Sequence, residues 1–168
     1  AYSGLGEDYR KGPDNASVVI VEFADFDCPY SKQVAAPLRR LLANNPDIRF
    51  VFRDFPIDAL HPDAAAVANA AECAREQNKF WPYHDKIFGA TAPFSTRQLL
   101  QFGQEIGLEY GQFERCLAEN RYADLVKADQ DAAKALGLHG TPTFFFNGQK
   151  VEGAIPDDIL NQVVAKLR

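Results

Sequence analysis

The clearest capacity for chemistry lies where β-branched residues give way to a helical pattern, in the run Asp27-Cys28-Pro29-Tyr30-Ser31. Proline is favoured at the first helical position because it has no amide hydrogen to leave unpaired, so we place Cys28 at the N-cap. A sulfur there faces the free amides of Tyr30 and Ser31 and the positive end of the helix dipole. Both effects favour the thiolate, which is the form that attacks a disulfide. The run therefore predicts a nucleophilic thiol at Cys28 rather than a cysteine buried only for packing.

Two stretches must position this run. Val18–Phe26 is rich in β-branched and aromatic residues and predicts a buried strand, and Ser31–Leu42 has helical spacing. Further along, the pattern predicts a strand over 48–54, helices over 61–76 and 80–88, a helix that Ser95 caps, helices over 112–120 and 122–136, strands 143–146 and 150–152 around Asn147-Gly148, and a helix over 156–167.

This order predicts an α/β fold in which a block of helices interrupts a small core of strands and helices. A length of 168 residues suits one domain. We expect residues 17–168 to form it, with 17–57 and 139–168 as the core and 58–138 as the helical insertion. Residues 1–16 are polar and glycine-rich, and we interpret them as an N-terminal linker or extension.

Composition and charge argue against two classes of partner. The chain has a net charge of -5 and shows no basic stripe, so we expect no nucleic-acid binding. Its longest apolar runs, 18–21 and 143–146, are only strand-length, so we expect no membrane insertion. The sequence contains no Met, which indicates a processed or trimmed chain, and residues 1–16 could once have followed a signal peptide or a further domain.

Three segments together resemble a known family. Phe-Ala-Asp-Phe-Asp-Cys-Pro-Tyr-Ser (residues 23–31) is similar to the active-site segment of DsbA-like thioredoxin-fold oxidoreductases, which have Cys-Pro-Tyr-Cys there. Gly-Thr-Pro-Thr-Phe (residues 140–144) resembles the cis-proline loop of that family. Residues 70–77 and 79–85 resemble its helical insertion. The likeness runs from about Gly12 to the C-terminus.

The resemblance implies a thioredoxin fold with an inserted all-helical subdomain. It also implies thiol–disulfide exchange on protein substrates that carry thiols or disulfides, without a cofactor. The expected location is the periplasm or another extracytoplasmic compartment, and the expected redox partners are a membrane protein or glutathione. Neither the redox direction nor the substrate follows from the sequence, because oxidase, isomerase and reductase differ in thiolate stability and partners.

Ser31 departs from the family, which has its resolving cysteine at that position. In the family's mechanism the first cysteine forms a mixed disulfide and the second releases it. A serine hydroxyl is a far weaker nucleophile and cannot form the internal disulfide. We therefore expect Cys28 to capture partners that Ser31 cannot release. Two origins stay open: an engineered Cys-to-Ser substitution that traps complexes, or a natural monothiol form resolved by an external thiol.

By resemblance, Pro142 follows a cis peptide bond and packs opposite Cys28. Such a loop leaves the Thr141 backbone free to pair with an extended peptide, in the manner of strand addition. The same resemblance assigns Pro29 and Tyr30 to substrate binding. From the residues alone, an ordinary trans proline opening a strand is the alternative.

The helical and strand patterns predict roles for three further residues. Cys73 and Cys116 each lie on an apolar helix face, so we predict that they pair in a structural disulfide; two unrelated buried thiols are the alternative. Glu22 lies in an apolar strand just before Cys28, where it is either a proton relay beneath the site or a solvated edge residue. Because the histidines and cysteines lack ligand spacing, we predict no metal site.

Three rival interpretations remain. A kappa-class glutathione transferase resembles this architecture but has serine in place of Cys28. A peroxiredoxin would have threonine where Asp25 stands. The third rival is a non-catalytic peptide-binding or holdase domain that kept the fold, which Ser31 makes plausible.

Overall fold

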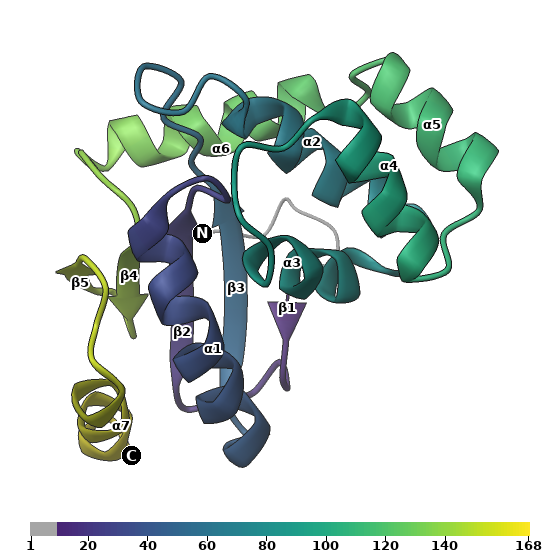
Figure 1. The fold of residues 1–168 in the computed structure, drawn as a ribbon. Helices are drawn as coiled ribbons and strands as arrows, with labels where there is room; N and C mark the ends of the chain where they lie inside the picture. Colours follow the sequence, from purple (N-terminus) through teal and green to yellow (C-terminus); the bar gives the residue numbers. More distant parts are fainter. Residues whose placement is uncertain (1–9) are drawn as a thin grey trace.

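The computed structural model describes residues 10–168, which form a mixed sheet with helices on both faces (Figure 1). The strand order is β1-β3-β2-β4-β5, and only β2 and β3 run parallel. The strands are β1 Arg10–Lys11, β2 Val19–Ala24, β3 Arg49–Asp54, β4 Thr143–Phe146 and β5 Gln149–Glu152. The helices are α1 Pro29–Asn44, α2 Ala64–Arg75, α3 Phe80–Phe88, α4 Thr96–Glu105, α5 Tyr110–Ala118, α6 Ala123–Ala135 and α7 Asp157–Lys166.

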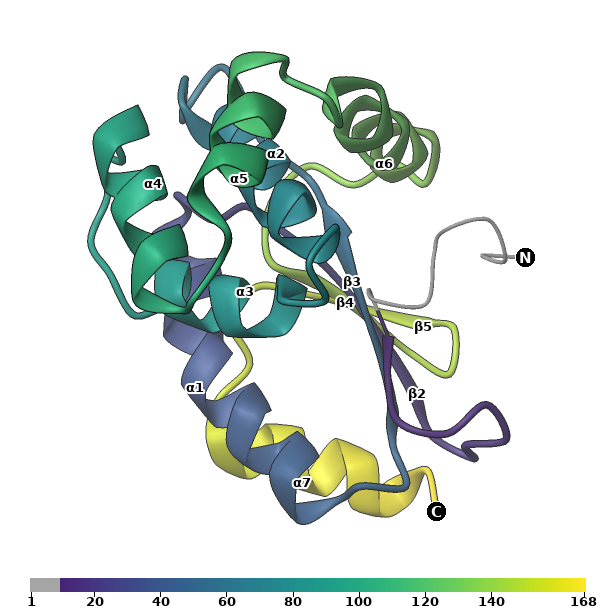
Figure 2. The same cartoon turned by 90° about the vertical axis from the view of Figure 1, so that its right-hand side faces the viewer.

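Side-chain alternation along the strands divides the core between the two faces of the sheet. On one face, Ile20 and Phe52 join the large cluster that α1, α3 and α7 cover (Figure 2). On the other face, Val21 and Phe23 pack with Ala133 of α6 in a smaller cluster. The parallel pair β2–β3 requires a crossover, which α1 supplies. Cys28 therefore lies at the end of a central, buried strand.

Helices α2 to α6 lie between β3 and β4 in the chain; in Figure 2, α3, α4 and α5 lie on the same side of the sheet as α1, and α6 lies on the opposite side. The alanine-rich α2 is buried along most of its length, because small side chains let the neighbouring helices approach closely. Ser95 caps α4 in a reciprocal capping box with Gln98, as predicted. The predicted bounds of α3 and β4 match the structure.

Buried charges join helix α6 to strand β3 of the sheet. Asp129 of α6 is fully buried, and its carboxylate contacts the Arg53 guanidinium at 2.7 Å and accepts a hydrogen bond from the Asp54 amide at 3.0 Å. Burial raises the pKa of Asp129 to about 6 and that of Asp54 well above its ordinary value, where the Glu72 charge adds to the effect. The sequence pattern did not predict this cluster.

The N-terminal segment differs from its predicted role as a linker. Arg10 and Lys11 pair with Val51 and Phe50 of β3 as a short antiparallel edge strand. A two-residue strand has no periodicity to detect, so the sequence carries no signal for it. Of the predicted linker or extension over residues 1–16, residues 1–9 lie outside the described residues. Over residues 10–168, each helix is too short or too polar to cross a membrane.

Candidate active site

Cys28 occupies the N-cap of α1, and Pro29 is the first helical residue, as the sequence predicted. The Cys28 amide donates to the Asp25 carbonyl at 3.0 Å, and the Cys28 carbonyl accepts from the Lys32 amide at 3.0 Å. Cys28 carries a free thiol and is 6% exposed. The backbone thus fixes the cysteine at the start of the helix and close to the surface.

The Cys28 sulfur has a different partner from the predicted one. Within the described chain it makes no capping hydrogen bond to the amides of α1; the thiol donates to the Thr141 carbonyl oxygen at 3.3 Å. The reason is chemical: a protonated thiol needs an acceptor, and amide hydrogens are donors. A thiol sulfur is only a weak acceptor, whereas a thiolate accepts strongly from amides, so a sulfur that donates to a carbonyl corresponds to the thiol form.

The loop that carries Thr141 is itself held by hydrogen bonds. The Thr141–Pro142 peptide bond is cis. The Thr143 hydroxyl donates to the Gly140 carbonyl at 2.8 Å, and the Gly153 amide donates to the Pro142 carbonyl at 2.8 Å. Two segments 113 residues apart in sequence therefore meet at the Cys28 thiol.

Ser31 lies one turn into α1 and is fully buried. Its hydroxyl oxygen accepts a hydrogen bond from the Asp25 amide at 3.4 Å. Pro29 and Tyr30 are exposed on the same first turn, and Tyr30 is 63% exposed. The first turn of α1 thus presents an apolar and aromatic surface outward, while its serine points into the protein.

The structure brings to the site two residues that the sequence pattern did not assign to it, Asp25 and His61. The Asp25 carboxylate is buried, and its Oδ2 lies 2.8 Å from His61 Nδ1. These residues are 36 positions apart, and His61 precedes α2, so helical or strand periodicity could not show that they meet. The only signal was an acidic residue at the end of an apolar strand, which alone indicates nothing about its partner.

Asp27 precedes Cys28 and adds a further carboxyl group to the site. Partial burial raises its pKa, and the negative charges of Asp25 and Asp63 act in the same direction, while His61 opposes them. The surroundings of the cysteine are therefore acidic, with His61 among the groups that offset this charge.

Glu22 is 2% exposed on the central strand β2, so the solvated-edge alternative is wrong. It borders a cavity of about 10 Å³ together with Lys11, Trp81 and His84. This volume is near the lower limit for holding one water molecule. Burial raises the pKa of Glu22 to about 8, so the carboxyl group is largely protonated at neutral pH.

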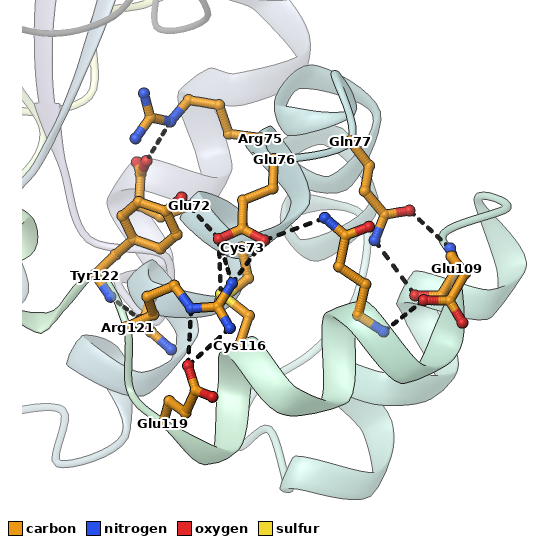
Figure 3. Close-up of a disulfide and its surroundings, with 12 residues drawn as sticks. Glu72, Cys73, Arg75, Glu76, Gln77, Glu109, Cys116, Glu119, Arg121 and Tyr122 are labelled. Carbon is orange, nitrogen blue, oxygen red and sulfur yellow. Dashed lines mark hydrogen bonds and ion pairs between the residues drawn. A yellow bond between two sulfur atoms is a disulfide. The ribbon is translucent and has the colours of Figure 1, made fainter.

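Cys73 of α2 and Cys116 of α5 form a disulfide, with Cα atoms 5.8 Å apart (Figure 3). Both residues are fully buried. Figure 3 shows Glu76 and Arg121 beside the bridge, where they form an ion pair of 2.7 Å. The pairing is the one that the helix faces predicted, and the alternative of two unrelated thiols is wrong.

Two other features lie away from Cys28. A groove of about 620 Å³ runs between the helices of the insertion, where Asn69, Leu99 and Val126 line it. Across residues 10–168, no group of three or more histidine, cysteine, aspartate or glutamate side chains could hold a metal ion.

Comparison with curated proteins shows that the chain is similar to one part of longer proteins. The chain is similar to the Na(+)/H(+) antiporter NhaA 3 of Salinispora tropica, at 37% identity over 157 residues, which are 94% of this chain and 24% of the antiporter. It thus spans about a quarter of the length of such curated relatives.

Solved structures show the same fold. A thioredoxin-like oxidoreductase from Silicibacter pomeroyi superimposes with a TM-score of 0.81 at 28% identity, covering 94% of this chain and 90% of that one. The thiol-disulfide exchange protein α-DsbA2 from Wolbachia pipientis gives a TM-score of 0.85 at 24% identity, covering 95% and 86%. A family model described as Thioredoxin matches residues 5–166. The chain belongs to this thioredoxin family and has the fold of its DsbA-like members, a thioredoxin core with inserted helices.

Proposed function

We propose that this domain performs thiol–disulfide exchange on protein substrates through Cys28, and that Ser31 makes the mixed disulfide a long-lived product. The observation that carries the proposal is the position of the Cys28 thiol, at the N-cap of α1 and 3.3 Å from the Thr141 carbonyl. The relatives named as a thioredoxin-like oxidoreductase and a thiol-disulfide exchange protein support the same class of chemistry.

The capture step balances as a disulfide exchange. The Cys28 thiolate attacks one sulfur of a partner disulfide, a new S–S bond forms, and the old S–S bond breaks. The second partner sulfur leaves as a thiolate and takes up a proton. Release needs a second thiol to attack the mixed disulfide, and the Ser31 hydroxyl cannot do so. An external thiol such as glutathione would have to complete the cycle.

Ionisation of Cys28 links capture to substrate binding. When the thiol loses its proton, its hydrogen bond to Thr141 is lost, and the Thr141 carbonyl becomes free to pair with an extended peptide. The exposed Pro29 and Tyr30 flank the sulfur and would contact the apolar side chains of that peptide. Pro142 shapes the opposite side of the site, next to Thr141.

Glu22 fits the role of a proton relay beneath the site. A carboxyl group with a pKa of about 8 can both release and accept a proton near neutral pH. The adjoining cavity of about 10 Å³ gives room for a water molecule that would carry the proton. In this proposal Glu22 contacts no substrate and acts only on proton movement.

We also propose an extracytoplasmic location. The Cys73–Cys116 disulfide is of a kind that persists in oxidising compartments and is rare where glutathione keeps thiols reduced. A membrane redox protein or glutathione would then be the natural partner of Cys28.

The Ser31→Cys variant tests the function directly. It restores a second thiol one helical turn from Cys28, so we expect catalytic turnover in dithiol oxidation or disulfide reduction where the wild type stalls after one event. Ser17→Cys is the matched control, because it adds a thiol at an exposed position at the start of β2. The proposal would be contradicted if Ser31→Cys turned over in neither assay, or if Ser31→Cys and Ser17→Cys turned over equally.

A second candidate function is peptide binding without catalysis. It is favoured by Ser31 and by the antiporter relatives, in which the matching segment is only a quarter of a larger chain. Peptide binding that survives Cys28→Ala unchanged would support this candidate. Glutathione conjugation without any reaction with disulfides would favour the transferase interpretation instead.

A further inference from the structure

The Asp25 carboxylate joins two backbone segments next to the active site. Its Oδ1 accepts a hydrogen bond from the Asp27 amide at 2.8 Å. Its Oδ2 accepts from the Ile57 amide at 2.9 Å and lies 2.8 Å from His61 Nδ1. The Asp25 side chain is fully buried, whereas that of His61 is 21% exposed. The carboxylate therefore ties the segment before α2 to the segment before α1.

The main chain of Asp25 holds Cys28 and Ser31 at the same time. Its carbonyl accepts from the Cys28 amide at 3.0 Å, and its amide donates to the Ser31 hydroxyl at 3.4 Å. A shift of Asp25 would therefore move the residue that carries the reacting sulfur. Thiol exchange requires in-line approach of sulfur to sulfur, and small misplacements of a reacting group are costly in rate.

We propose that His61 is a positioning residue for Cys28 and that it acts through Asp25. The inference rests on the proposed function, because it concerns the reactivity of the same sulfur. A buried carboxylate is stable only with hydrogen-bond donors and a compensating charge, and His61 supplies both when its ring is protonated.

The charge of His61 acts on Cys28 together with the surrounding acids. The carboxylates near this pair are Asp25 itself, Asp27 and Asp63, and all of them disfavour a second negative charge on the sulfur. A positively charged His61 offsets part of this negative charge beside the sulfur, and removal of His61 leaves the three carboxylates without that compensation.

Two substitutions separate the hydrogen bond from the charge. His61→Asn keeps an amide donor close to the position of Nδ1 but cannot be protonated, and His61→Leu removes both the donor and the charge. The measurement is the rate of Cys28 alkylation by iodoacetamide from about pH 4 to about pH 9. Because Cys73 and Cys116 are bridged, Cys28 is the thiol that reacts.

We expect His61→Leu to slow alkylation at about pH 8 by roughly tenfold. For His61→Asn we expect a rate within about twofold of the wild type at that pH, with the midpoint of the profile raised by roughly half to one pH unit. A merely structural role would lower the thermal unfolding temperature and leave the midpoint unchanged. If His61→Leu fails to fold, the midpoint of His61→Asn alone decides.

A double-mutant cycle tests whether the effect passes through Asp25. In an Asp25→Asn background, adding His61→Leu should change the rate by less than about twofold. Asp131→Asn is the matched control background, because it removes an exposed carboxylate that pairs with Lys127 on α6. There the full tenfold loss should remain. An equal loss in both backgrounds, or a wild-type profile for both His61 variants, would overturn the proposal.

The two proposals fail in different ways. Alkylation needs no partner disulfide, so it reports on His61 even if Cys28 captures nothing. Failure of the wild type to form an adduct with glutathione disulfide would count against the proposed function, and the alkylation profiles would still decide the role of His61.

Discussion

The molecule contains two sulfur sites that differ in position far more than in burial. Cys28 is 6% exposed, and Cys73 and Cys116 are fully buried. Cys28 lies at a helix start, facing a carbonyl from a distant loop, whereas the other two face each other between α2 and α5. A sulfur at a helix terminus near the surface can exchange partners, and a sulfur between packed helix faces has a fixed one.

The largest expected effect concerns covalent capture. Cys28→Ser replaces the reacting sulfur by oxygen, so we expect no mixed disulfide with glutathione disulfide under conditions in which the wild type gains one glutathione. The Cys73–Cys116 bridge should remain intact in this variant. Intact-protein mass spectrometry checks both statements, and an adduct on the variant would show that another sulfur reacts.

The Cys73→Ala/Cys116→Ala double variant tests the other site. Loss of a bridge between residues 43 positions apart should lower the free energy of unfolding by about 4 kcal/mol in the chain-entropy model. Urea denaturation measures this change. Well below its unfolding temperature, the variant should still capture glutathione at Cys28. Loss of capture in a folded double variant would mean that the two sites are coupled.

Glu22→Gln tests the buried acid on β2. In the folded protein the pKa of Glu22 is about 8, against an ordinary value of 4.5. The folded state thus keeps a proton that the unfolded chain releases, and the resulting stability is lost as pH rises from about 4.5 to about 8. The glutamine of the Glu22→Gln variant cannot ionise, so the variant does not lose this stability as pH rises.

Relative to the wild type, Glu22→Gln should therefore gain stability as pH rises from about 4.5 to about 8, by roughly 1.4 kcal/mol per pH unit at most. Denaturation across that range measures the gain. Glu114→Gln, which changes an exposed acid on α5, is the matched control and should show no such trend. A constant difference between Glu22→Gln and wild type would contradict the raised pKa.

The smallest expected effect compares two helix starts. Ser95→Ala removes a capping box from α4 and should lower the free energy of unfolding by about 1 kcal/mol. Cys28→Ser places a preferred cap residue at the start of α1, where the cysteine makes no capping bond, and should not lower it. Parallel urea titrations compare them. A larger loss from Cys28→Ser would mean that the thiol is structurally important.

Local patterns predicted much of this structure. The spacing of residues 80–88 and the apolar run at residues 143–146 gave the correct element bounds, and Pro29 placed Cys28 at the N-cap. Helix faces also predicted the partner of Cys73. These features depend on residues close in sequence, or on faces that must be buried.

Features that depend on distant contacts were not predictable. Three contacts each join separate segments: the Asp25–His61 pair, the hydrogen bond from Cys28 to Thr141, and the contact of Asp129 with β3. A single polar residue has no periodicity, so its partner appears only when the chain is folded. The site is therefore predictable in its sulfur and not in the groups that surround it.

Incubation of the wild-type protein with glutathione disulfide tests the central claim most directly. We predict a single glutathione adduct, located on Cys28 by peptide mapping, that persists after gel filtration and disappears on addition of excess thiol. Absence of an adduct, or an adduct that is lost without added thiol, would contradict the account of Cys28 as a capturing thiol that Ser31 cannot release.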